Sequence, residues 1–169
     1  IRIRPGIRYQ PHPAFARDTA GRYRYHVLRA EDMADKRQIA DFPYVGTREL
    51  VAADYVYQIK RLADPRNSSP IFGLMSEHIV GLRELGKTLE KALQARPGRT
   101  LDLDAFALSG AEAVDRYTYR IRIKGKYPQF LYWLAMPFFA PVPWEAEVFY
   151  AQPGRTDGNR TLDWHPVGP

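Results

Sequence analysis

The sequence contains no cysteine among its 169 residues. This absence excludes disulfide bonds, thiolate metal ligands and a cysteine nucleophile. It does not fix the cellular compartment, because proteins of oxidising compartments can also lack cysteine. No signal peptide is visible either, and the chain starts at Ile1 without an initiator methionine. We therefore interpret the chain as a mature protein or an excised fragment.

No apolar run is long enough to cross a membrane, which takes about 20 residues. The best candidate, Phe130 to Val142, is short and contains Pro137 and Pro141. The histidines have no zinc-ligand spacing, no serine lies in a nucleophile elbow, and no glycine-rich phosphate loop is present. We expect no metal, no cofactor and no enzymatic activity, with a small hydrolase as the least favoured class.

Hydrophobic residues make up 45% of the chain and aromatic residues 13%, which favours a folded core over disorder. We predict a single domain over residues 1–169 with an α+β fold, in which helices pack on a small, mostly antiparallel sheet. The aromatic residues near its C-terminal end have a spacing typical of core packing, with an apolar ligand groove as the alternative. These residues are Phe130, Tyr132, Trp133, Phe138, Phe139 and Trp144.

Positive charge is concentrated in the first 30 residues. They contain seven arginines and a single acidic residue, Asp18, which accounts for the whole net charge of +6. Together with Tyr9, Phe15, Tyr23 and Tyr25, these arginines give the alternative hypothesis of a basic nucleic-acid-binding module in residues 1–30. The favoured interpretation is a solvated face or a surface that meets an acidic neighbour, because no nucleic-acid motif accompanies the arginines.

The stretch Thr47 to Pro70 gives the clearest helix signal. Its small and apolar residues between Ala52 and Ala63 form one stripe, and its polar residues Asp54, Gln58 and Arg61 are assigned to the opposite face. Pro65 is expected to stop the helix. The segment from Asn67 to Pro70 has the composition of a turn.

Other elements follow from shorter patterns. Residues 1–4 and 117–124 alternate apolar and basic side chains, which predicts two strands that pair antiparallel and crowd like charges unless acids counter them. Residues 7–46 are expected to form an elaborated loop packed by its aromatic residues, with a short strand over 23–28 and a short helix over 30–39. Helices are predicted over 71–95 with a break at Gly81, over 128–136 and over 144–150, and an extended segment over 161–169.

Acidic residues occur in close pairs at three places. A glycosidase needs an acid and a base at a set separation, which a sequence cannot give. We assign these residues to the surface or to helix caps. They are Glu31 with Asp32, Asp102 with Asp104, and Glu145 with Glu147.

Four stretches together resemble the family 5 extracellular solute-binding proteins, which are the dipeptide and oligopeptide receptors of ABC importers. The stretches follow one another in the family's order. They are IRIRPGIRYQPHPAF at 1–15, RELVAADYVYQIKRLADP at 48–65 with Ser69-Pro70, VDRYT at 114–118 with PQFL at 128–131 and PVP-W-E at 141–145, and WHPVG at 164–168.

The chain departs from the family pattern at three points. Val51 stands where the family has a threonine as helix cap, which puts that cap in doubt. The 7–46 insertion is longer than in many relatives. Pro169 follows Gly168 directly, where the family has a Thr-Gly-Pro hinge segment.

The resemblance implies a fragment of a larger periplasmic receptor that captures peptides or similar solutes and delivers them to an ABC transporter permease. It implies a subdomain of the two-lobed type II periplasmic binding protein fold, the N-lobe insertion region, with most of the cleft outside these 169 residues. It also implies that the segment after the Ser-Pro step approaches the ligand. The candidate ligand-binding residues are therefore Ser69, Ile71 and Phe72, with a helix start packed in the core as the alternative. Nucleic acid is not expected as a partner, nor is a membrane span.

Overall fold

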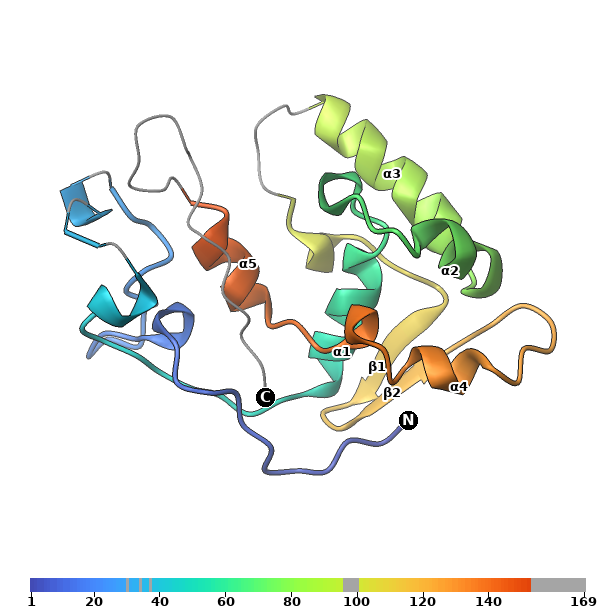
Figure 1. Ribbon diagram of the computed structural model, residues 1–169, viewed down its shortest axis with the longest axis horizontal. Coiled ribbons are helices and arrows are strands. Elements are labelled where there is room, and N and C mark those ends of the chain that lie inside the picture. Colours follow the sequence, from blue (N-terminus) through green and yellow to red (C-terminus); the bar gives the residue numbers. More distant parts are fainter. Residues whose placement is uncertain (30, 34, 37, 96–100, 153–169) are drawn as a thin grey trace. The chain divides into compact units, whose positions relative to one another are not determined.

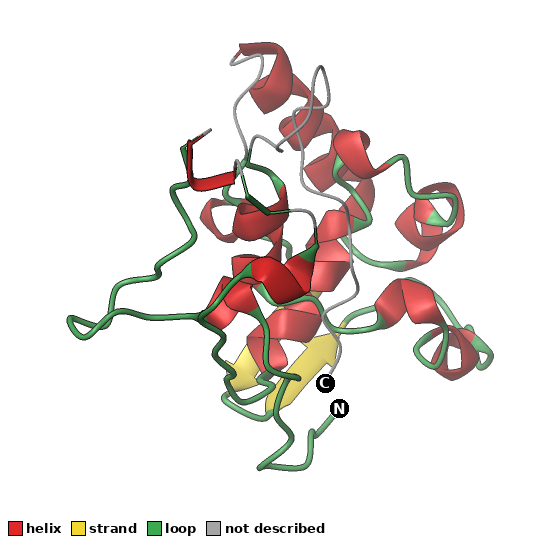
Figure 2. Cartoon of the chain, turned by 60° about the vertical axis from the view of Figure 1, so that its left-hand side comes forward, coloured by secondary structure: helices red, strands yellow, loops and turns green. Residues whose placement is uncertain are grey.

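The computed structural model describes residues 1–29, 31–33, 35–36, 38–95 and 101–152. Within these residues the chain forms five α-helices and one two-stranded antiparallel sheet, which confirms the predicted α+β class (Figures 1 and 2). The chain divides into two compact units. The first unit comprises residues 1–5 and 51–141, and the second comprises residues 6–50 and the segment from Val142 onward. The single domain over residues 1–169 stays a prediction, and no described helix is long and apolar enough to cross a membrane.

The first unit is organised around helix α1 (Ala52–Arg61), which contacts both strands of the sheet (Figure 1). The predicted apolar stripe is largely buried, but two residues of the predicted polar face are buried as well. Asp54 and Gln58 are only 3% and 8% exposed, although the pattern assigns them to the face opposite the apolar stripe. Gln58 donates from Nε2 to the carbonyl oxygen of Phe138 at 2.7 Å. Polar side chains can be buried on a helix when such partners satisfy them.

The start of α1 has no side-chain cap, as the departure at Val51 led us to expect. Val51 occupies the N-cap position, and its side chain has no acceptor atom. Instead, Asp54 Oδ2 accepts the N–H of Val51 at 3.0 Å. The carbonyl oxygen of Arg116 accepts the N–H of Ala52 at 2.9 Å. One acceptor within the helix and one from the turn after β1 thus satisfy the first N–H groups in place of a side-chain cap.

The sheet consists of β1 (Ala111–Asp115) and β2 (Thr118–Ile121). The predicted antiparallel pairing of the first residues with this second strand is confirmed, in the form of a single bridge at Arg2. The N–H of Ile3 donates to the carbonyl oxygen of Tyr117 at 2.7 Å. Strand β1 was not predicted, because alanine, glutamate and aspartate have low strand propensity.

Acidic residues counter the expected crowding of basic side chains on the sheet. Glu112 of β1 places Oε1 2.7 Å from Nη2 of Arg122 and 3.5 Å from Nε of Arg120. The two arginines are about half exposed, so each pair contributes only about 0 to 1 kcal/mol. This charge balance lets the strand keep its alternation of basic and apolar residues.

Helices α2 (Phe72–His78) and α3 (Leu82–Ala95) confirm the predicted helical segment and its break. Gly81 lies between them at φ +76°, a left-handed conformation that side chains disfavour. A Cβ atom there would lie 2.4 Å from Ser109 Oγ, so glycine is required for two reasons.

Helix α4 (Phe130–Trp133) is shorter than the predicted 128–136 segment and is followed by a 3₁₀ turn, Pro137–Phe139. Phe130 and Phe139 are 6% and 3% exposed, in agreement with core packing. Tyr132 is 75% exposed and does not belong to the core.

The second unit consists mostly of loops packed against helix α5 (Trp144–Tyr150), which begins and ends as predicted. The described part of residues 7–46 contains only 3₁₀ turns and isolated bridges, so the predicted short strand and short helix are wrong. The ring centroids of Phe42 and Phe149 lie 5.3 Å apart, which agrees with a loop packed by aromatic residues. The expected extended segment over 161–169 lies outside the described residues.

Candidate functional site

The loop after α1 forms one wall of a pocket in the first unit. The helix ends at Arg61, turn hydrogen bonds continue as far as Asp64, and Asp64 itself is extended at ψ 115°, as expected for the residue before Pro65. Pro65 opens a 3₁₀ turn, Pro65–Asn67, that Asp64 caps. The next residue, Ser68, has φ +44° and is the one residue other than glycine with positive φ in the described chain. Such strain costs about 1 to 3 kcal/mol and often marks functional loops.

Asp64 holds this loop in place. Its side chain is fully buried, and Oδ1 accepts the backbone N–H of Arg66 at 3.0 Å. Nε of Arg66 lies 3.0 Å from Oδ1 and 3.1 Å from Oδ2 of the same carboxylate. A buried carboxylate with this many donors fixes the backbone beneath the pocket.

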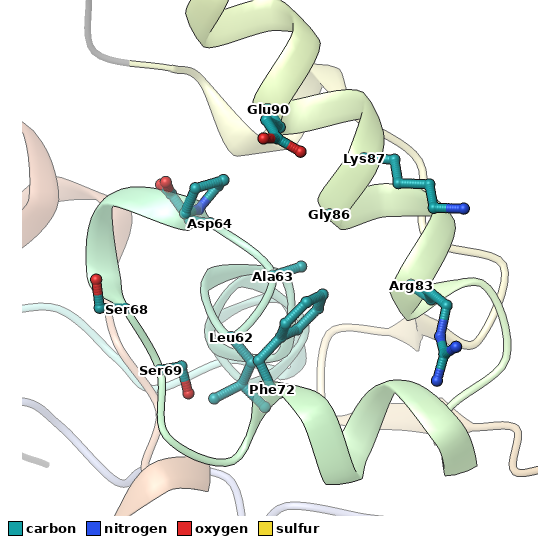
Figure 3. Close-up of a pocket in the computed structure, with 11 residues that line it drawn as sticks. Leu62, Ala63, Asp64, Ser68, Ser69, Phe72, Arg83, Gly86, Lys87 and Glu90 are labelled. Atoms are coloured by element: carbon teal, nitrogen blue, oxygen red, sulfur yellow. The ribbon is translucent and has the colours of Figure 1, made fainter.

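The ring of Phe72 forms the opposite wall. It rises from α2 toward α3, where Gly86 leaves room for it (Figure 3). A Cβ atom at Gly86 would lie 2.6 Å from Cζ of Phe72. The close approach of the two helices therefore depends on this glycine.

Between these walls lies a pocket of about 380 Å³ (Figure 3). Ser69 and Phe72 line it, so the structure brings together two of the three predicted ligand-binding residues. Ile71 does not line it and is 8% exposed, which fits the alternative of a helix start packed in the core. The remaining lining residues are Leu62, Ala63, Asp64, Pro65, Ser68, Arg83, Gly86, Lys87 and Glu90.

Sequence reasoning missed the wall that α3 contributes. A signal was present, because Gly86 interrupts a run of strong helix formers and a glycine there costs about 1 kcal/mol relative to alanine. The pocket combines apolar surface, serine hydroxyls and charges of both signs, a chemistry suited to holding a small polar organic group. Among the described residues, no three acidic or histidine side chains gather as metal ligands would.

Most arginines of the basic segment bind groups of their own unit. Arg17 donates from Nη1 to the carbonyl oxygen of Gly21 at 2.7 Å, and Arg8 donates to that of Thr47 at 3.2 Å. Arg22 pairs with Asp18 at 2.9 Å. These contacts give the nucleic-acid alternative less support, because that alternative needs free cations for phosphate contacts.

The carboxylate of Glu145 is buried in the second unit, although its place in a close pair of acids led us to expect a surface or capping residue. Glu145 is 2% exposed, so its assignment to the surface or to a cap is wrong. Arg48 donates to both of its oxygens, from Nε at 2.7 Å and from Nη2 at 2.8 Å. The hydroxyl of Tyr23 donates to Oε1 at 2.9 Å. Asp32 and Asp102, in contrast, accept backbone N–H groups as predicted.

Burial raises the pKa of Tyr23 to about 12, and the negative charge of Glu145 adds to this effect. Burial also raises the pKa of Tyr119 to about 12, with a smaller contribution from Tyr55. Because both values are above the ordinary pKa of about 10, the folded state favours the neutral phenols. The resulting stability is fully present below pH ~10 and is lost as the pH rises toward ~12.

An alkaline titration followed by absorbance at 295 nm is therefore expected to show a late phase near pH ~12, or a phase that coincides with unfolding. The Tyr23→Phe variant should lose part of this late phase, because one of the buried phenols is gone. An unchanged late phase in that variant would contradict the assignment.

Comparison of the chain with known protein families, with curated proteins and with solved structures finds no match.

Proposed function

We propose that this chain is part of a periplasmic solute-binding protein that captures peptides or similar solutes and delivers them to the permease of an ABC transporter. The proposal rests on the resemblance of the four sequence stretches. The observation that carries it is the pocket that opens directly beside the step Ser69-Pro70, where the resemblance implies a ligand-side segment. The role is binding and transfer, without a catalytic step.

The chemistry of the pocket supports such a role. Its volume of about 380 Å³ suits one or two amino-acid side chains rather than a whole peptide. Its mixed walls favour tolerance over tight selection, as expected of receptors that bind peptides mainly through the backbone and leave water in the side-chain pockets. In the proposed two-lobed architecture a second lobe supplies much of the cleft, so the 169-residue chain alone is expected to bind peptides weakly.

Uptake of labelled peptides by cells that contain or lack the protein tests the proposal. We expect cells without it to lose peptide uptake and to keep the uptake of free amino acids, and we expect the protein in the periplasmic fraction. Unchanged uptake of all peptides tested would contradict the proposal. If the 169-residue chain alone binds a peptide with micromolar affinity in calorimetry, the proposal that a second lobe supplies much of the cleft is contradicted.

The contribution of the pocket is tested by Gly86→Ala in the complete receptor. The new Cβ atom displaces the ring of Phe72 and changes the pocket, so we expect peptide affinity to fall by roughly fivefold, which is about 1 kcal/mol. Gly73→Ala is the matched control, because a Cβ atom at Gly73 meets nothing within 4 Å. If the two variants bind peptide with equal affinity, the pocket does not contribute to peptide binding.

A further inference from the structure

The second unit presents a small, rigid hairpin that the proposed function does not use. Arg17 and Tyr23 form an antiparallel bridge. Between them, Asp18 Oδ1 accepts the N–H groups of Ala20 and Arg22, each at 2.9 Å. Such a turn is fixed locally by its own side chain. The hairpin therefore holds its arginine and tyrosine side chains in defined positions.

The side chain of Arg24, at the end of this hairpin, is held in one orientation by its neighbours. Its guanidinium carbon lies 4.0 Å from the ring centroid of Tyr44. Its Nε donates to the carbonyl oxygen of Arg17 at 3.2 Å, and its backbone N–H donates to that of Ala16 at 2.9 Å. Among the described residues, no acceptor binds its two Nη groups. A stacked guanidinium with one edge free is preorganised to bind a carboxylate through two parallel hydrogen bonds.

An open hollow of about 490 Å³ surrounds this guanidinium. Tyr44 is 52% exposed at its edge. Arg22 adds a second cation, although Asp18 already accepts from it at 3.0 Å. The lining residues are Asp18, Arg22, Tyr23, Arg24, Tyr25 and Tyr44.

One aromatic ring of the hollow, that of Tyr23, is covered on both faces and is not available as a platform for a nucleic-acid base. The guanidinium carbon of Arg17 lies 3.9 Å from the ring centroid of Tyr23, and the ring of His26 stacks on the same ring at 4.0 Å. Two groups at these distances occupy opposite faces. Tyr25 packs edge-on against Phe42 at 5.0 Å. Binding of single-stranded nucleic acid depends on free aromatic faces. Because Tyr23 has none and Arg24 covers one face of Tyr44, this geometry favours a partner that offers carboxylates over one that offers bases.

We infer that this hollow is a docking site for an acidic peptide segment, in which Arg24 binds a carboxylate of the partner through both Nη groups and Tyr44 holds the guanidinium in place. The charge of the segment agrees with this partner, since residues 6–30 of the second unit contain five arginines and a single acidic residue. The inference does not rest on the proposed function, because its residues lie outside the pocket beside Ser69.

A titration of the ¹⁵N-labelled chain with hexaglutamate, followed by NMR, tests the inference on the unaltered protein. The largest shifts are expected at the Arg24 side chain and at the backbone of Tyr44 and its neighbours, and they should diminish in high salt. Shifts centred outside the hollow, or none at millimolar peptide, would overturn the inference.

Variants separate recognition from net charge. Arg24→Ala should weaken hexaglutamate binding about tenfold, and Arg24→Lys by a similar factor, because lysine keeps the charge but lacks the planar fork. Arg29→Ala is the control with the same loss of charge outside the hollow, and it should change binding less than about twofold. Tyr44→Phe keeps the ring and should bind as the unaltered chain does. Equal losses for Arg24→Ala and Arg29→Ala, or tighter binding of a dT oligonucleotide than of hexaglutamate, would overturn the inference.

Discussion

Glu145→Gln is expected to lower the free energy of unfolding of the second unit by about 3 to 5 kcal/mol. The substitution keeps the shape of the side chain but removes the charge that receives two hydrogen bonds from Arg48 and one from Tyr23. The guanidinium of Arg48, which is only 24% exposed, then loses the carboxylate that accepts two of its hydrogen bonds. Denaturant unfolding, with hydrogen exchange of the amides in α5 as the local readout, measures the loss.

Glu31→Gln is the matched control for this prediction. Glu31 also pairs with an arginine of the second unit, Arg29 at 3.2 Å, but both side chains are more than 70% exposed. Exposed pairs contribute about 0 to 1 kcal/mol, so the control should unfold nearly as the unaltered chain does. If the two variants are equally stable, the buried carboxylate does not organise the second unit.

Arg66→Met is expected to cost the first unit about 3 kcal/mol, because it leaves the carboxylate of Asp64 buried without its cation. The side chain of Asp64 is fully buried, whereas that of Arg66 is 30% exposed. The charge left behind by Arg66→Met is therefore the fully buried one, so neutralising it should reduce the loss of stability. Adding Asp64→Asn to Arg66→Met should recover part of the loss, since the amide is less costly to bury than an unpaired charge.

Arg83→Met is the control, because Arg83 pairs with Glu77 at 3.6 Å on an exposed surface. It should change the free energy of unfolding by less than about 1 kcal/mol in urea titrations. A double variant at residues 64 and 66 that is less stable than Arg66→Met alone would contradict the assigned origin of the loss.

The parts of the fold that the sequence predicted are those with strong local signals. The helical stripe of α1, the break at Gly81 and the bounds of α5 depend on periodicity, on glycine and on proline within the segment itself. The pairing of residues 1–4 with β2 was also predicted, because both stretches carry the same alternation of apolar and basic residues.

The other parts depend on partners that are distant in the sequence. The local pattern places Gln58 on the polar face of α1, and its partner, the carbonyl oxygen of Phe138, lies 80 residues away in the sequence. Glu145 has the pattern of a surface acid until Arg48, 97 residues away, binds it. Of the residues that line the candidate pocket, only Ser69 and Phe72 were named beforehand, through the family resemblance. Nothing in the local pattern places Gly86 of α3 beside the ring of Phe72.

The second unit cannot complete its contacts during synthesis until helix α5 has been made. Arg48 and Glu145 are 97 residues apart, and His12 contacts Tyr150 across 138 residues. At about 5 to 20 residues per second, residues 6–50 leave the ribosome roughly 5 to 20 seconds before α5 exists. In that interval the continuous segment 51–141 of the first unit is completed, while the aromatic residues of the first segment still lack their partners. Residues 6–50 contain eight basic and six acidic residues, and this small positive net charge opposes the aggregation of the waiting segment.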